Sequence, residues 1–212
     1  MNFSTDRDLL ALEPNVFRDV PLLSQQRVSV TDAVVSGTTL TSATADFQAA
    51  GVDAGSVVLV SEVAHEVVAR TDANTLTISL PRTSLIEASI PSGDGTNLAV
   101  VARTFAPQAT LVHDVLLRLV GIDPNDPDSE ITEDSIVSLG VLSRLEALGT
   151  LERVYSAALA LAGDNSPLHE KTREYRRRFQ AACASASVLI DLNGDGQADA
   201  RRTLGVIRLR RS

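Results

Sequence analysis

The chain has 212 residues, which is enough for one large domain or two small ones with real hydrophobic cores. Hydrophobic residues make up 44% of the sequence, so we expect it to fold rather than remain disordered. Aromatic residues make up only 3%, which argues against a nucleic-acid surface that depends on base stacking. The single cysteine, Cys183, excludes a disulfide within the chain.

The net charge of −8 is unevenly distributed. Residues 166–212 contain 10 Lys and Arg against 5 Asp and Glu, whereas residues 1–165 contain 9 against 22, so the two parts carry +5 and −13. An acidic body with a basic C-terminal end predicts two different electrostatic environments. A solvated acidic surface is the simpler alternative.

The sequence contains no targeting or membrane signal of the usual kinds. Its N-terminus lacks a basic region followed by an apolar one, which a signal peptide requires. No apolar run reaches the roughly 18 residues that span a bilayer. We therefore expect a soluble protein made in the cytoplasm, without a membrane partner.

The first half of the chain predicts a short helix followed by a β module. Residues 6–12 are expected to form a helix with Thr5 as its N-cap and Pro14 just after its end. This helix and its lead-in occupy residues 1–26. In residues 27–105, short β-rich runs are separated by turn signals, a spacing that predicts a small antiparallel barrel or sandwich.

After residue 105 the hydrophobic period changes from two to about 3.6, which predicts a helical bundle over residues 106–186. The first helix is expected to end at Gly121. Its apolar stripe consists of Leu111, Val115, Leu116 and Leu119. Thr132 is expected to cap a second helix, which Gly149 separates from a third, and a Ser-Pro pair at residues 166–167 begins a fourth.

Taken together, these elements predict an α+β fold with four segments. They are an N-terminal helix and lead-in (1–26), a small antiparallel β barrel or sandwich (27–105), a bundle of about four helices (106–186) and a C-terminal β-hairpin (187–212).

Oxygen-bearing side chains recur at alternate positions in the loop of this hairpin, in the pattern D-x-N-x-D-G-x-x-D. The candidate metal ligands are the side chains of Asp191, Asn193, Asp195 and Asp199 and the carbonyl of Gln197. Hard oxygen ligands that converge in a tight loop suit Ca²⁺. An EF-hand would need a carboxylate where Arg202 stands, so the loop is similar instead to the nine-residue calcium loops of integrin-type propeller blades. A hairpin turn that needs no metal is the alternative.

Basic side chains gather on the last predicted helix and at the end of the chain. The candidate partner-binding residues are Arg176, Arg177, Arg201, Arg202, Arg208, Arg210 and Arg211. Such clusters can contact DNA phosphates or an acidic neighbouring subunit. A solvated helix face and strand end is the alternative interpretation.

No pattern in the sequence points to catalysis. The histidines, His65, His113 and His169, have no second His or Cys at metal-binding spacing. The chain contains no G-x-S-x-G elbow and no glycine-rich nucleotide-binding loop. We therefore expect a protein that is not an enzyme.

The order of these segments, together with several local phrases, resembles a known family. Residues 13–20 (EPNVFRDV) follow the first helix, residues 47–58 carry F-x-x-x-G-V-x-x-G-x-x-V, and residues 105–108 (FAPQ) lead into the helices. The chain resembles the head–tail connectors, or neck adaptors, of tailed bacteriophages and prophages. The β module departs from the minimal, all-helical adaptor.

This resemblance implies a structural virion protein of the neck, made in the host cytoplasm. It implies a homo-oligomeric ring, expected to have twelve copies, between the portal protein and a tail or stopper protein. DNA would pass through without sequence-specific contacts, and an acidic channel would let it slide. The alternative from another class is a calcium-dependent binding module without catalytic activity, for which Asp195→Ala would abolish function.

Overall fold

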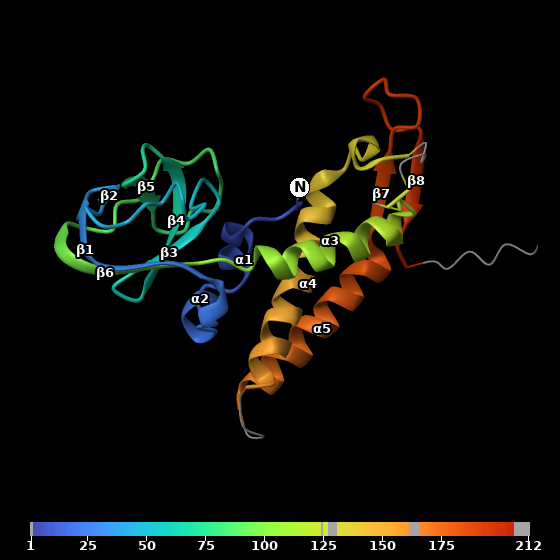
Figure 1. Cartoon of the computed structure of the whole chain (residues 1–212). Helices are drawn as coiled ribbons and strands as arrows, with labels where there is room; N and C mark the ends of the chain where they lie inside the picture. Colours follow the sequence, from blue (N-terminus) through green and yellow to red (C-terminus); the bar gives the residue numbers. More distant parts are fainter. Residues whose placement is uncertain (1, 124, 127–130, 162–165, 206–212) are drawn as a thin grey trace, which may run out of the picture. The chain divides into compact units, whose positions relative to one another are not determined.

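The computed structural model describes residues 2–123, 125–126, 131–161 and 166–205 (Figure 1). The chain divides into two compact units. The barrel unit is Thr5–Ala106, and the helical unit combines Met1–Ser4 with Pro107–Ser212. The predicted α+β fold, with an antiparallel β module, about four helices and a C-terminal hairpin, is confirmed.

Antiparallel strands in the order β1-β2-β5-β4-β3-β6 close into a barrel. The strands are β1 (Gln26–Ser36), β2 (Thr39–Thr41), β3 (Val57–Val60), β4 (Val63–Arg70), β5 (Thr75–Ser79) and β6 (Gly95–Arg103). The core of the barrel is aliphatic apart from Phe47, and its fully buried members include Leu40, Val58, Leu76 and Val100. Because β-branched residues suit a pleated, half-buried surface, a barrel of this size forms with very few aromatic residues.

Two short helices, α1 (Asp6–Leu12) and α2 (Val16–Asp19), pack against β3 and β4 of the same unit. Thr5 precedes α1 as predicted, and its N–H donates to the carboxylate of Asp8 at 2.7 Å. This exchange between the N-cap and the first turn is the capping-box arrangement that defines a helix start. A 3₁₀ turn, η1 (Leu23–Gln25), then leads into β1.

The described part of the helical unit contains α3 (Ala106–Val120), a 3₁₀ turn η2 (Glu133–Ser135), α4 (Leu139–Leu159) and α5 (Leu168–Ser185). The predicted break at Gly149 is wrong, because α4 continues through it. A Cβ atom on Gly149 would lie 2.7 Å from Val112 of α3 and 3.0 Å from Phe179 of α5. Gly149 therefore allows three helices to approach closely and does not end one.

The buried face of α3 is not the apolar stripe predicted from the sequence. Of the four predicted residues, Leu116 is fully buried, whereas Leu111, Val115 and Leu119 are 54%, 37% and 45% exposed. The side chains that α3 buries are Ala109, Val112, His113, Leu116, Leu117 and Val120. The helix thus has a second apolar face that the described residues of its own unit leave partly exposed.

The hairpin strands β7 (Ser187–Ile190) and β8 (Ala200–Thr203) belong to the core of the helical unit (Figure 1). Val188 and Ile190 are fully buried against residues of α3 and α4. The other edge of β7 pairs with residues 135–137, since Asp191 N–H donates to the Ser135 carbonyl at 2.8 Å and Val137 N–H to the Leu189 carbonyl at 3.0 Å. The base of the hairpin is therefore fixed by packing on one face and hydrogen bonds on both edges.

Candidate functional site

Glu66 of β4 is the centre of a buried ion cluster in the barrel unit. Its side chain accepts hydrogen bonds from Arg7 Nε of α1 and from Arg82 Nε, the latter at 2.5 Å. The backbone N–H of Arg82 also donates to Glu66, and Arg7 Nη2 donates to the Arg82 carbonyl at 3.0 Å. Burying a carboxylate requires such pairing, so the cluster fixes the point at which the β5–β6 connection leaves the barrel.

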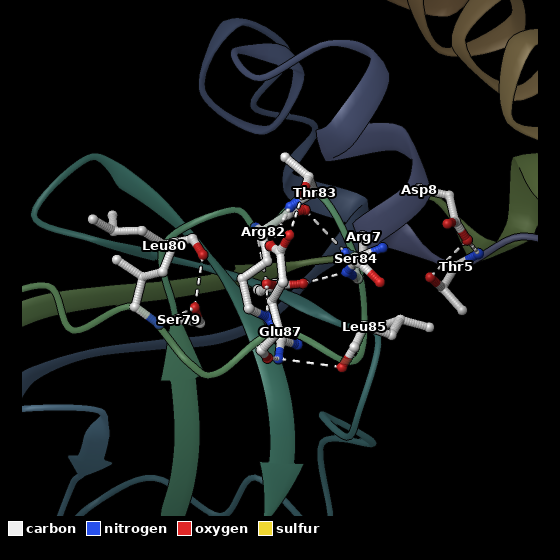
Figure 2. Close-up of polar contacts among 12 residues, drawn as sticks. Thr5, Arg7, Asp8, Ser79, Leu80, Arg82, Thr83, Ser84, Leu85 and Glu87 are labelled. Carbon is white, nitrogen blue, oxygen red and sulfur yellow. Dashed lines mark hydrogen bonds and ion pairs between the residues drawn. The ribbon is translucent and has the colours of Figure 1, made fainter.

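Arg82 also determines the shape of that connection (Figure 2). Its Nη1 donates to the Glu87 carbonyl at 2.6 Å and reaches the Leu85 carbonyl at 3.4 Å. Hydrogen bonds from Thr83, first of all from its side chain, lower the pKa of the Glu87 carboxyl. Two apolar residues of this loop, Leu85 and Ile86, have side chains that are 69% and 95% exposed. In Figure 2 the Leu85 side chain points away from the polar cluster.

The loop therefore displays two large apolar side chains on a scaffold held by several side-chain hydrogen bonds. Exposed apolar residues on a preorganised loop are a common form of protein-binding surface. Sequence reasoning missed this feature. The available signal was the Leu-Ile pair inside a polar loop that begins with proline, at residues 81–87.

Glu146 of α4 is the centre of a second buried polar network, in the helical unit. Its carboxylate accepts the N–H groups of Phe3 and Ser4, the hydroxyl of Ser4 at 2.8 Å, and a contact of 3.0 Å from His113 Nδ1. The other ring nitrogen of His113 lies 3.2 Å from Glu133. The Ser4 hydroxyl donates to Glu146 and not to His113, so these residues do not form a nucleophile–base pair. The network attaches the N-terminal residues to the helical core.

The predicted calcium loop closes on itself through Asp191. The two carboxylate oxygens accept the N–H groups of Asn193 at 3.1 Å, Gly194 at 2.7 Å and Gly196 at 2.7 Å. These bonds, led by the one from Gly196, lower the pKa of Asp191. Both glycines have positive φ angles of 77° and 81°, which explains why the turn uses glycine at these positions.

The remaining predicted ligands lie in the same turn. Asn193 Oδ1 accepts the N–H of Asp195, Asp195 Oδ1 accepts that of Gln197, and Asp199 Oδ2 accepts that of Leu192. Across the described residues, no three His, Cys, Asp or Glu side chains gather in a group that could hold a metal ion. Calcium binding by this loop stays a prediction.

Four of the predicted partner-binding arginines make contacts within the helical unit. Arg176 pairs with Glu152 at 3.1 Å and Arg177 with Glu174 at 2.5 Å, both on the surface. The other two are on β8. There Arg201 Nε donates to the Ser187 hydroxyl at 2.9 Å.

Arg202 donates to the Val120 carbonyl at the C-terminal end of α3. A guanidinium there satisfies a free helix carbonyl and complements the helix dipole, which gives Arg202 a structural role. Arg208, Arg210 and Arg211 lie outside the described residues.

A groove of about 690 Å³ runs between α4 and α5. Its lining combines buried leucines, small residues and two arginines: Gly140, Val141, Arg144, Leu145, Leu148, Arg178, Ala181, Ala182, Ser185 and Ala186. The Arg178 guanidinium lies 5.0 Å from the centre of the Tyr175 ring, a cation–π contact that helps to hold it beside the groove. The groove and the exposed α3 face (Leu111, Val115 and Leu119, hereafter the ridge) are different surfaces of one unit.

Comparisons of this chain with protein-family models, with curated proteins and with solved structures gave no match. Within the described residues, no helix has the length and apolar character needed to cross a membrane.

Proposed function

We propose that the chain is a structural subunit of a phage or prophage head–tail connector. In this role, copies of it form a ring between the portal and the tail, around the passage for DNA. The order of segments supports the proposal, since a small β module precedes a helical unit with a short C-terminal hairpin. The observation that carries it is the ridge, an apolar helix face left in solvent by the isolated unit.

A ridge of three large apolar side chains, repeated at one-turn spacing, is an interface pattern. Scattered exposed leucines are ordinary on a protein surface, but an aligned set indicates a surface that is covered in the working assembly. The ridge differs from the groove in shape and chemistry. Contacts between two different surfaces of identical subunits are heterologous, and they produce closed rings when the rotation between neighbours closes.

The charge distribution supports the same role. The barrel unit, residues 5–106, contains 6 Arg and 12 Asp and Glu, so it carries −6. Helix α5, residues 168–185, contains 5 Lys and Arg and 2 Glu, so it carries +3. An acidic surface repels DNA phosphates and favours sliding over binding, while a basic helix can contact an acidic neighbouring subunit.

The proposal is tested by measuring the mass of the purified protein over a range of concentrations, alone and mixed with the portal ring encoded in the same genome. We expect a ring-sized species, either alone or on the portal, and negative-stain images that show it coaxial with the portal. A protein that stays monomeric at high micromolar concentration and also fails to bind the portal would overturn the proposal.

A further inference from the structure

We propose that the ridge of one copy occupies the α4–α5 groove of the next copy. This inference rests on the proposed ring and names the two surfaces that meet in it. The partner is a second copy of this chain, because the same unit carries both a partly exposed apolar helix face and an open groove.

The two surfaces match in length. From Leu111 to Leu119 the ridge covers eight residue steps of α3, which is about 12 Å at 1.5 Å per residue. From Gly140 to Leu148 the groove also covers eight steps of α4, again about 12 Å. The ridge and the α4 side of the groove therefore have similar lengths.

They also match in shape and polarity. Four of the groove-lining residues have little or no side chain: Gly140, Ala181, Ala182 and Ala186. Small residues let a neighbouring helix approach closely. Leu145 and Leu148 form an apolar floor, and Val141 is partly exposed at its side. Large side chains on the ridge and small ones in the groove are the combination that allows interdigitated packing.

The charges favour one direction for the helix in the groove. Arg144 and Arg178 have no carboxylate partner among the described residues. The exposed Asp123 follows the C-terminal end of α3, where Arg202 already donates to the Val120 carbonyl. The flank of the ridge carries one charge of each sign, Asp114 and Arg118, so Asp123 decides the preference. We infer that this end lies at the Arg178 end of the groove.

Disulfide trapping between two single-cysteine variants tests this contact directly. In a Cys183→Ala background, one variant carries Val115→Cys on the ridge and the other Ala181→Cys in the groove. Both positions are exposed, so neither change should disturb folding. We expect a cross-linked dimer when the two are mixed and oxidised, and none from either alone. A matched pair with Arg173→Cys, an exposed position on α5 outside the groove, should give none.

A second variant measures the contribution of the ridge without any cross-link. Val115→Arg should weaken self-association by at least about tenfold, since it places a cation on an apolar floor between Arg144 and Arg178. Val34→Arg, a control at a similarly exposed valine of the barrel unit outside both surfaces, should assemble as the parent does. Circular dichroism and melting temperature should be the same for both variants.

The outcomes separate this inference from the proposed function. If rings form but the mixed cysteine variants do not cross-link and Val115→Arg assembles normally, the ridge–groove contact is refuted and the connector proposal stands. Cross-linking of Val115→Cys with itself would show a symmetric contact and refute it as well. A chain that neither self-associates nor binds a portal overturns both proposals.

Discussion

Replacing Glu146 by alanine should destabilise the helical unit severely. The side chain is fully buried in the middle of α4, and it accepts hydrogen bonds from the Phe3 N–H, the Ser4 N–H and the Ser4 hydroxyl, in addition to its contact with His113. Glu146→Ala removes the common acceptor of all these groups at once. The N-terminal residues then have nothing in the core to bind, and several polar groups lose their partner.

The magnitude follows from the burial and the number of donors. Hydrogen bonds to a charged group contribute roughly 1.5–3 kcal/mol each, and removing one member of a buried ionic network costs roughly 3–5 kcal/mol in total, because the contributions are not additive. We therefore expect a loss of about 4 kcal/mol in the free energy of unfolding of the helical unit. This is a large part of the roughly 5–15 kcal/mol that stabilises a typical domain.

Glu152→Ala is the matched control, since Glu152 lies on the same helix but pairs with an exposed arginine, Arg176. An exposed pair is worth no more than about 1 kcal/mol, and the change in helix propensity is the same for both substitutions. Urea unfolding followed by circular dichroism gives the two free energies, and hydrogen exchange at Phe3 and Ser4 reports the N-terminal attachment. The reasoning fails if Glu146→Ala costs no more than Glu152→Ala, or if exchange at these two amides is unchanged.

Four further predictions concern single features of the two units. Burial raises the pKa of Asp6 from 3.8 to about 6, so the folded state binds the proton more tightly, and the stability of the barrel unit should fall as pH rises from about 4 to 6. In urea titrations at a series of pH values, Asp6→Asn should remove this loss of stability, which is on the order of 3 kcal/mol. Gly149→Ala should lower the melting temperature of the helical unit, because the free-energy cost of overpacking three helices exceeds the gain in helix propensity from alanine. An unchanged melting temperature would contradict the packing role of Gly149. Arg82→Ala should accelerate hydrogen exchange in residues 83–90 by removing the donor that shapes the loop, and equal exchange would show that other contacts hold it. If the hairpin loop binds calcium as predicted, millimolar CaCl₂ should raise the melting temperature and slow hydrogen exchange in the hairpin, whereas MgCl₂ should do neither. Asp195→Ala should abolish the calcium effect, and identical melting curves with and without CaCl₂ would refute the prediction.

Local sequence signals were sufficient for the fold class and for the start of the first helix, but not for the extent of α4. Short β-rich runs separated by turns predicted an antiparallel barrel or sandwich, and closing the sheet removes the edges that an open one would expose. The helix start at Thr5 was predicted because its cap is a local interaction between residues three apart. Gly149 was misread for a related reason. Glycine disfavours a helix locally, but here the tertiary contacts of α4 with α3 and α5 require it.

The buried polar networks could not be predicted, because their members are far apart in the sequence. Ser4 and Glu146 are separated by 142 positions, and Arg7 and Glu66 by 59. A glutamate in a helix or strand normally indicates the solvent face, and only the tertiary structure shows which one is buried with its partners. The Asp/Gly loop is the opposite case, since its turn is formed almost entirely by neighbouring residues.

The incorrect assignment of the α3 face bears on the function of the molecule. Two sets of apolar residues on α3 repeat at helical spacing, one through Val112 and Leu116 and the other through Leu111 and Val115. Hydrophobic periodicity cannot distinguish the two sets, because a helix face can be apolar either to pack within its own chain or to pack against another subunit. The fold covers one set only. Burial of the second face by another copy would explain why α3 is apolar on two faces in a chain with a groove of similar length. For this reason the ridge supports the connector proposal more directly than the arginines or the Asp/Gly loop do.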